Sequence, residues 1–519
     1  MENSRTSNSY KTMISGIYMQ VFTILLSFLT RTVFIKVLGA EYLGINGLFS
    51  NLLSVISLAE LGVGTAITFY LYKPIANNDK EKMKSLINFY KIAYTIIGIA
   101  ILCIGLSVIP FLNRLIKPSS ELNINYTLVY FLFLLDPVAS YLFYAYKSTI
   151  IAANQKTYVL NRINISVSVC KSLILILVLA IFRNYILTLI LNILATLIRN
   201  ILVSIKAGKL YPFINDKSYL KLNWVEIRSI MKDVYSIFIV RISSTLFQST
   251  DNIVISIMIG TIYVGIYSNY LLLIGTIVGI LTIIRGSITA SVGNINAIES
   301  VETKYKMFRN LDFFNFYLSS ICAICFYHLL NPFILLWIGK EYVFNQTIVG
   351  VIVANFLTVS LLSIVFLFRE TLGLFRYGKY RQLVGGILNI FLDIFLARQL
   401  GVLGVLLATL FSSLLVTIFP FPKIVYKYGF NKPYKEYIYR YLGYCAFTII
   451  SIILVSIPIS VISRDDWFGL LFRLFFSLLI PNILYYIMFR KTEEFIWVKG
   501  KLNYVANNIN ESIRLRKAG

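Results

Sequence analysis

The stretch "TRTVFIKVLGAEYLGI", residues 30–45, places an arginine and a lysine within a long apolar run, and a similar phrase returns later in the chain. That second phrase, "TDNIVISIMIGTIYVGI", residues 250–266, repeats the spacing of Gly39, Tyr42 and Gly44. The two copies align without a gap at an offset of 221 residues. One motif written twice in this way indicates two structurally related halves, an organisation that many transporters use.

Composition places the chain in a membrane. Of its 519 residues 58% are hydrophobic and 14% are charged, and the mean hydropathy is +0.77. Apolar runs of roughly 20 residues, the length that crosses a bilayer, recur throughout. The polar start "MENSRTSNSYKT" argues against a cleavable signal peptide. The sequence therefore predicts an all-α integral membrane protein with spans at 12–37, 44–72, 86–112, 123–149, 157–181, 184–205, 232–259, 265–290, 308–330, 346–368, 379–399, 402–426, 438–462 and 465–490.

The distribution of positive charge orients these spans. An even number of spans puts both termini on one side, and most of the 48 Lys and Arg lie in tails and loops on that side. Because such loops stay in the cytoplasm, both termini are predicted to be cytoplasmic. The net charge of +25 thus follows from topology and attraction to anionic lipid, and indicates no nucleic-acid partner.

The repeat defines the predicted domains. Its offset covers six spans, so both copies run the same way across the membrane, as in a parallel pseudo-two-fold repeat. We expect two six-helix bundles facing a shared cavity, with two extra helices after them. The expected segments are an N-terminal bundle at 12–205, a cytoplasmic linker at 206–231, a C-terminal bundle at 232–426, two further helices at 438–490 and an amphipathic tail at 491–519.

Each copy of the motif follows a polar stripe at helical spacing. Steps of three and four place such residues on one face of a helix, and this face is predicted to line the cavity. In the first span the stripe includes Gln20, Ser27 and Arg31, and in the seventh it includes Arg241, Gln248 and Asn252. Two alternatives stay open, since Arg31 is near enough to the outer end of its span to reach the head groups, and Arg241 could instead form an ion pair.

Other charges lie deep in the predicted spans, where an ionised group costs roughly 2.5–3.5 kcal/mol and usually faces a cavity or a partner. For Lys171 we expect cavity lining, with a structural ion pair as the alternative. The acids are candidates for gating or ion coupling: Glu60, Asp136, Asp251 and Asp393. Asp136 has an alternative role, because Pro137 follows it and a kink there would free backbone groups for its carboxylate to bind.

Cations from both halves suit an anionic cargo, because Arg and Lys bind phosphate oxygens strongly where water is scarce. The chain shows no nucleophile motif and no phosphate-binding glycine loop, and the pair Cys322 and Cys325 lies within an apolar span. We therefore expect no catalytic residues, no metal and no cofactor beyond coupling to H⁺ or Na⁺.

The segment "LGAEYLGINGLFSNLLSVISLAELG" within residues 31–76, with "STDNIVISIMIGTIYVGIYSNYLLLI" at 249–274, resembles the openings of the two halves of Wzx-type flippases. These are polysaccharide repeat-unit transporters of the multidrug/oligosaccharidyl-lipid/polysaccharide (MOP) superfamily. The resemblance covers all fourteen predicted spans. It implies a MATE/MOP-like fold that flips undecaprenyl-diphosphate-linked oligosaccharide from the inner to the outer leaflet of the bacterial cytoplasmic membrane, for capsule or exopolysaccharide synthesis.

The same resemblance implies roles and partners. A cationic cavity containing Arg31, and on depth alone Lys171 and Arg241, would receive the diphosphate and sugar, while the lipid tail stays among membrane lipids. Glu60 lies within the family-like "AELG" and would gate the cavity or carry a proton. A polysaccharide polymerase and glycosyltransferases are the expected protein partners, with the C-terminal tail as a docking segment.

Three alternatives remain. A lipid II flippase of the same superfamily would share the cavity and serve cell-wall synthesis. A multidrug antiporter would need acidic and aromatic lining for cationic cargo, whereas cations are found here. A membrane polymerase or glycosyltransferase would need a sizeable outer loop with polar catalytic residues, and the longest predicted outer loops, "LNRLIKPSSELN" and "GKEYVFNQ", are short.

Overall fold

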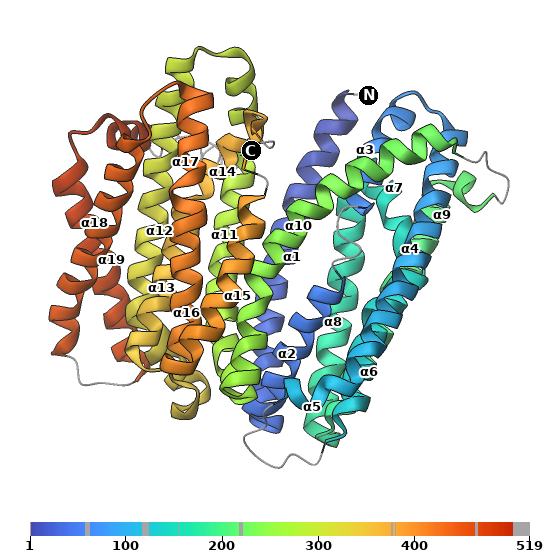
Figure 1. The fold of residues 1–519 in the computed structure, drawn as a ribbon, viewed down its shortest axis with the longest axis horizontal. Helices are drawn as coiled ribbons and strands as arrows, with labels where there is room; N and C mark the ends of the chain where they lie inside the picture. Colours follow the sequence, from blue (N-terminus) through green and yellow to red (C-terminus); the bar gives the residue numbers. More distant parts are fainter. Residues whose placement is uncertain are drawn as a thin grey trace, which may run out of the picture. The chain divides into compact units, whose positions relative to one another are not determined.

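The computed structural model describes residues 2–57, 63–116, 124–154, 156–216, 222–374, 377–378, 380–461 and 466–501, and this part of the chain is helical without a β-strand. It divides into two compact units. Unit 1 comprises Met1–Ser268 with Ala397–Val402, and unit 2 comprises Asn269–Leu396 with Leu403–Gly519. One boundary falls within the long helix α11, and the two others fall near the end of α15 and at the start of α16 (Figure 1).

Unit 1 contains the first ten helices. Within it α1 packs on α8, and α6 packs on both α4 and α9 (Figure 1). Their bounds are α1 Glu2–Leu38, α2 Ala40–Ile56, α3 Val63–Ala76, α4 Lys80–Val108, α5 Leu112–Leu115, α6 Tyr126–Leu142, α7 Ser148–Ala153, α8 Thr157–Phe182, α9 Tyr185–Leu210 and α10 Trp224–Met258. Short 3₁₀ turns occupy Ile109–Phe111, Ala145–Lys147 and Pro212–Asn215.

Unit 2 is organised around α12, which contacts α13, α18 and α19. Its helices are most of α11 Thr261–Ile298, of α15 Arg381–Leu400 and of α16 Val402–Ser413, together with α12 Val301–Ile338, α13 Gln346–Leu361, α14 Ser363–Thr371, α17 Pro420–Ile424, α18 Lys435–Ser460 and α19 Trp467–Phe489. Phe316 of α12 stacks on Tyr444 of α18 with ring centroids 3.8 Å apart. Beside this stack the buried carboxylate of Asp312 pairs with Arg440 at 3.3 Å, so α18 is fixed to α12 by both packing and charge.

Short polar side chains set where many of these helices begin. A side-chain oxygen before the first turn accepts a backbone N–H that the helix itself leaves unbonded. This cap is seen at Asp79, Asn125, Asn184, Asn223, Ser300, Asn345 and Asp466. At α10 the cap is reciprocal, since Asn223 accepts from the backbone N–H of Glu226 and the Glu226 carboxylate accepts from that of Asn223. The predicted linker at 206–231 therefore already contains the start of α10.

Eleven helices of the described residues are long and apolar enough to cross a membrane, or twelve if α6 and the segment Ala145–Ala153, which meet at 49°, form one bent span. The protein is thus an all-α multi-pass membrane protein, as the sequence predicts. The predicted spans without such a helix are the second and the seventh. The second, 44–72, includes residues 58–62, which lie outside the described residues. The seventh, 232–259, corresponds to the continuous helix α10, which ends at Met258. Its run from Arg241 to Asn252 is mostly polar in sequence.

The two copies of the repeated motif form the same local structure and contact each other within unit 1. Gly39 and Gly260 both have positive φ, at 90° and 152°, and each stands just before a helix. One turn further on, a Cβ on Gly44 would lie 2.0 Å from the carbonyl oxygen of Thr261. A Cβ on Gly265 would lie 2.2 Å from the carbonyl oxygen of Ala40.

These contacts are reciprocal, because the same offset of 221 residues relates Ala40 to Thr261 and Gly44 to Gly265. Two elements related by a two-fold axis make such contacts, because if residue i of the first copy contacts residue j of the second, then residue i of the second contacts residue j of the first. Only glycine allows two helix backbones to approach this closely. The contacts therefore relate the two copies of the motif by a local two-fold axis, and they explain why a glycine stands at this position in both copies.

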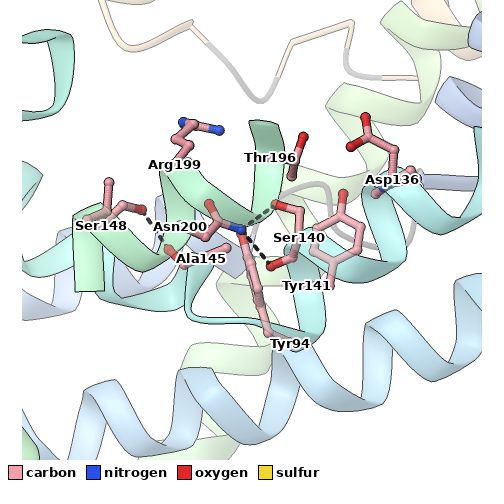
Figure 2. Close-up of a pocket in the computed structure, with 11 residues that line it drawn as sticks. Tyr94, Asp136, Ser140, Tyr141, Ala145, Ser148, Thr196, Arg199 and Asn200 are labelled. Atoms are coloured by element: carbon pink, nitrogen blue, oxygen red, sulfur yellow. Dashed lines mark hydrogen bonds between the residues drawn. The ribbon is translucent and has the colours of Figure 1, made fainter. Parts of the chain in front are cut away.

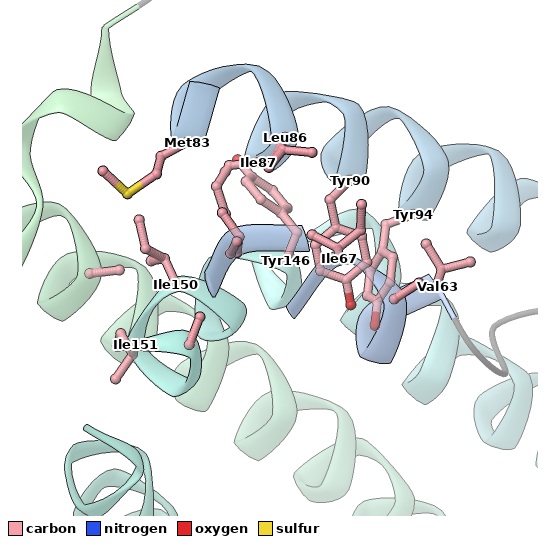
Figure 3. Close-up of a cluster of buried hydrophobic side chains, with 14 of the residues drawn as sticks. Val63, Ile67, Met83, Leu86, Ile87, Tyr90, Tyr94, Tyr146, Ile150 and Ile151 are labelled. Carbon is pink, nitrogen blue, oxygen red and sulfur yellow. The ribbon is translucent and has the colours of Figure 1, made fainter. Parts of the chain in front are cut away.

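A cluster of buried apolar side chains holds one end of unit 1 together (Figure 3). It joins α3, α4 and α7, and includes Ile67, Leu86 and Ile150. Tyr90 and Tyr94 lie edge to face within it, with centroids 4.2 Å apart. Tyr94 also lines the pocket described below, so the packed cluster fixes one wall of that pocket.

Candidate functional site

Arg31 is held at the repeated motif. It lies on α1, partly buried, and its Nη2 donates to Ser268 Oγ at 2.6 Å. Ser268 in turn donates to the carbonyl oxygen of Gly265 at 2.6 Å, on the first turns of α11. The guanidinium is therefore oriented by the second copy of the motif, within unit 1. A cation fixed in this way keeps its charge in place with little loss of side-chain freedom on binding.

The other members of the first polar stripe line up on the same helix. Gln20 and Ser27 of α1 are partly buried, whereas Phe22 and Leu25, which stand between them in the sequence, are exposed. Lys171 is partly buried on α8, which packs along α1. The structure thus brings two of the three predicted cations onto adjacent helices, and their role in cargo binding stays a prediction.

Several predicted residues lie on α10 or beside α2. Asp251 and Asn252 of α10 are buried. The side chains of Arg241 and Gln248 on the same helix lie outside the described part of the structure, and so does the whole of Glu60. Their predicted roles in binding and gating stay predictions.

Unit 2 contains a cation that the sequence argument missed. Arg285 of α11 is partly buried, and its Nη2 donates to Ser360 Oγ at 2.8 Å. Ser319 of α12 also donates to Ser360 Oγ at 3.1 Å, and Asn315 donates to the Ser360 carbonyl at 2.9 Å. The signal was present, because Arg285 stands inside the predicted span 265–290 and depth in a span is the criterion that selected Arg31.

Asp393 forms the most buried polar cluster among the predicted sites. Asp393 and Asn389, one turn apart on α15, are both 0% exposed. Asn389 Nδ2 donates to Asp393 Oδ1 at 3.0 Å and to Thr409 Oγ1 of α16 at 3.3 Å. A carboxylate surrounded by amide and hydroxyl groups in a span can bind a proton or a hard cation such as Na⁺, because these favour oxygen ligands.

Asp136 lines a pocket of about 390 Å³ in unit 1 (Figure 2). The pocket lies at the bend between α6 and the segment Ala145–Ala153, and its walls come from α4, α6 and α9. Asn200 of α9 closes one wall by donating to Ser140 Oγ at 3.3 Å. Arg199, a second cation that the sequence argument missed inside a predicted span, stands at its edge.

Comparison with known proteins gives structural matches alone. No family model matches the sequence, and no curated protein matches it. Among solved structures, the lipid II flippase MurJ in an inward closed conformation aligns with a TM-score of 0.63 at 15% identity, over 92% of this chain and 99% of MurJ. The chain has the fold of a MOP-type transporter.

Two further structures support this assignment of the fold. An inward-facing multidrug resistance MATE family transporter of the MOP superfamily aligns with a TM-score of 0.53 at 14% identity, over 79% of this chain and 98% of its own. The Vibrio cholerae MATE transporter VcmN aligns with a TM-score of 0.52 at 16% identity, over 82% and 98%. The predicted MATE/MOP-like fold is therefore confirmed.

Proposed function

We propose that this protein flips undecaprenyl-diphosphate-linked oligosaccharide repeat units from the inner to the outer leaflet of a bacterial cytoplasmic membrane. The units would then be polymerised into capsule or exopolysaccharide. The observation that carries the proposal is the match to a lipid II flippase over 92% of the chain, taken with the repeated motif that resembles Wzx-type transporters. Both termini would lie in the cytoplasm, and the protein would catalyse no covalent reaction.

The charges at depth support an anionic head group as cargo. Arg31 is oriented by Ser268 in unit 1, and Arg285 is oriented by Ser360 in unit 2. A guanidinium binds phosphate oxygens through paired N–H donors, and a low-dielectric site strengthens the attraction. Within its own unit each of these two cations is thus held in position by a serine. In the proposed mechanism the carrier alternates between inward-open and outward-open states, and the diphosphate binds to a cation of this kind. The isoprenoid tail would stay in the lipid.

Asp393 is the proposed coupling site. Its carboxylate is fully buried with Asn389 and Thr409 around it. Binding of H⁺ or Na⁺ there would neutralise a charge whose burial is otherwise costly. Such binding can favour one state of the carrier over the other only if affinity differs between them. Asp251, buried on α10, is the second candidate for this role.

A lipid II flippase is the second candidate function, and the match to MurJ is the observation that favours it. Both cargoes carry an undecaprenyl diphosphate, so the cations described above serve either. They differ in the sugar, and the choice between them therefore depends on the cargo presented. The proposed partners, a polymerase and glycosyltransferases, apply to the first function only. The predicted docking segment is the tail at 491–519. Its first part, 491–501, is described, and there Glu494 accepts a hydrogen bond from Arg309 Nε of α12 at 2.8 Å. The rest of the tail lies outside the described residues.

Reconstitution tests both functions in one experiment. The purified full-length protein is placed in liposomes loaded with fluorescent undecaprenyl-diphosphate oligosaccharide or with fluorescent lipid II, and an external quencher reports which leaflet holds the label. We expect faster transfer of the oligosaccharide. Transfer of lipid II alone would establish the second function, and transfer of neither, with the protein folded, would refute both.

A further inference from the structure

The pocket at the bend of α6 has a shape and a charge pattern that the proposed transport does not use. It lies within unit 1, is lined by both a carboxylate and a guanidinium, and has a volume of about 390 Å³. We propose that this pocket binds the head group of a zwitterionic phospholipid, with the ammonium at Asp136 and the phosphate at Arg199.

Asp136 requires a hydrogen-bond donor. Its Oδ1 is buried, and no partner for this atom exists among the described residues. Leaving a buried acceptor unsatisfied costs about 1–3 kcal/mol, and more when the group is charged. A primary ammonium in the pocket would offer N–H donors and a compensating positive charge to the carboxylate that lines it.

Arg199 supplies the opposite charge. Its Nε donates to Asn164 Oδ1 of α8 at 2.7 Å, which fixes the guanidinium plane and leaves its two terminal nitrogens for another acceptor. A phosphate oxygen pair matches that fork. In Figure 2, Arg199 and Asp136 lie on opposite sides of Thr196, so the two charges flank one polar space.

Two other polar residues of the wall, Asn200 and Ser148, are hydrogen-bonded within the wall itself. Asn200 donates to the carbonyl oxygen and the hydroxyl of Ser140 at 3.4 and 3.3 Å, and Ser148 donates to the carbonyl of Ala145 at 2.7 Å. These bonds hold α9 and the bent segment in place. They leave Asp136 and Arg199 as the groups that a ligand would contact with charge.

The position of Arg199 points to lipid as the source of the ligand. It is exposed on α9. From residue 194 to residue 205 the other exposed side chains of this helix are apolar: Leu194, Ile198, Ile201, Leu202 and Ile205. An apolar surface of this kind on a membrane protein faces acyl chains. A pocket of several hundred Å³ also suits a small organic group better than a single ion, since a water molecule occupies about 30 Å³.

Lipid retention tests the proposal on the whole protein. The purified chain is stripped of lipid in detergent and mixed with phosphatidylethanolamine, phosphatidylglycerol or phosphatidylcholine, and bound lipid is counted by native mass spectrometry. We expect about tenfold stronger retention of phosphatidylethanolamine, the scale of one hydrogen bond to a charged group. Phosphatidylglycerol lacks the ammonium, and the ammonium of phosphatidylcholine lacks N–H donors.

Variants assign the two ends of the head group. Asp136→Asn should remove the preference for phosphatidylethanolamine, and Arg199→Gln should weaken all three lipids about tenfold. Arg183→Gln, which removes an exposed arginine after α8 and outside the pocket, should change neither. Equal retention of the three lipids by the unsubstituted protein would overturn the proposal without any variant. A second result would also overturn it: Na⁺ raises the melting temperature in a way that depends on Asp136, whereas phosphatidylethanolamine does not raise it. The pocket would then be an ion site.

Discussion

Replacing Gly44 with alanine should force the two copies of the repeated motif apart. The new Cβ would lie 2.0 Å from the carbonyl oxygen of Thr261, whereas ordinary contact begins at 3.4 Å. The obstacle is backbone, which cannot rotate away as a side chain does, so α2 and α11 must separate by about 1.4 Å. Overpacking of this kind costs about 1–3 kcal/mol. We expect Gly44→Ala to lower the free energy of unfolding by that amount.

Equilibrium unfolding of the purified protein in mixed detergent micelles measures the loss. Gly265→Ala should cost a similar amount, because its Cβ would lie 2.2 Å from the carbonyl oxygen of Ala40. The same separation relieves both clashes, so the double variant should cost less than the sum of the two. Gly275→Ala is the control: nothing lies within 4 Å of its Cβ, and the helix gains up to about 1 kcal/mol from alanine. A Gly44→Ala protein as stable as this control, or strict additivity, would refute the reciprocal contact.

Three further outcomes are expected. Arg31→Ala should abolish export of the polysaccharide precursor while the protein stays in the membrane at its normal level. Arg31→Lys should restore part of the export, because lysine keeps the positive charge but lacks the paired N–H donors of the guanidinium. Full export by the alanine variant would contradict a role of Arg31 in cargo binding. Arg440→Leu should lower the free energy of unfolding by about 3–5 kcal/mol, since it strands Asp312, and adding Asp312→Leu should recover most of the loss. A hydrogen bond from Lys82 lowers the pKa of Glu226. Their pair therefore stabilises the fold above the ordinary carboxylate pKa of 4.5, and this stabilisation is lost as pH falls through the lowered pKa. The difference in melting temperature between the unsubstituted protein and Glu226→Gln should be constant near neutral pH and vanish in acid.

The repeat and the all-α membrane fold class could be predicted, because both depend on patterns among residues that are close together in the sequence. Apolar length predicts spans, and the spacing of Gly39 and Gly44 returns at Gly260 and Gly265. What the offset alone could not show is that the two copies touch. Contact depends on how helices cross, and no local pattern contains that information.

The bend of the fourth span illustrates a second limit. The sequence directs attention to Pro137, yet Pro137 lies inside α6 and the helix continues to Leu142. The chain turns at Tyr144, a non-glycine residue with φ of 62°, a conformation that side-chain type does not predict. The pocket beside Asp136 follows from this turn, so the sequence could indicate the acid but not its setting.

The site residues show a third limit, in the choice of candidates. Arg199 and Arg285 lie within predicted spans and could have been selected from the sequence. The hydrogen-bond partners of Arg31 and Arg285 could not have been predicted from it. Ser268 is 237 positions from Arg31, and Ser360 is 75 positions from Arg285. Such hydrogen bonds depend on the packing of helices that are distant in the chain.

The location of lipid-linked oligosaccharides in cells that lack this protein tests the proposed function most directly. The gene is deleted in its host, and undecaprenyl-linked units are located by leaflet with a membrane-impermeant reagent. We expect single complete units confined to the cytoplasmic leaflet, together with loss of surface polysaccharide. Units exposed on the outer leaflet but left unpolymerised would contradict a flippase and indicate a polymerase.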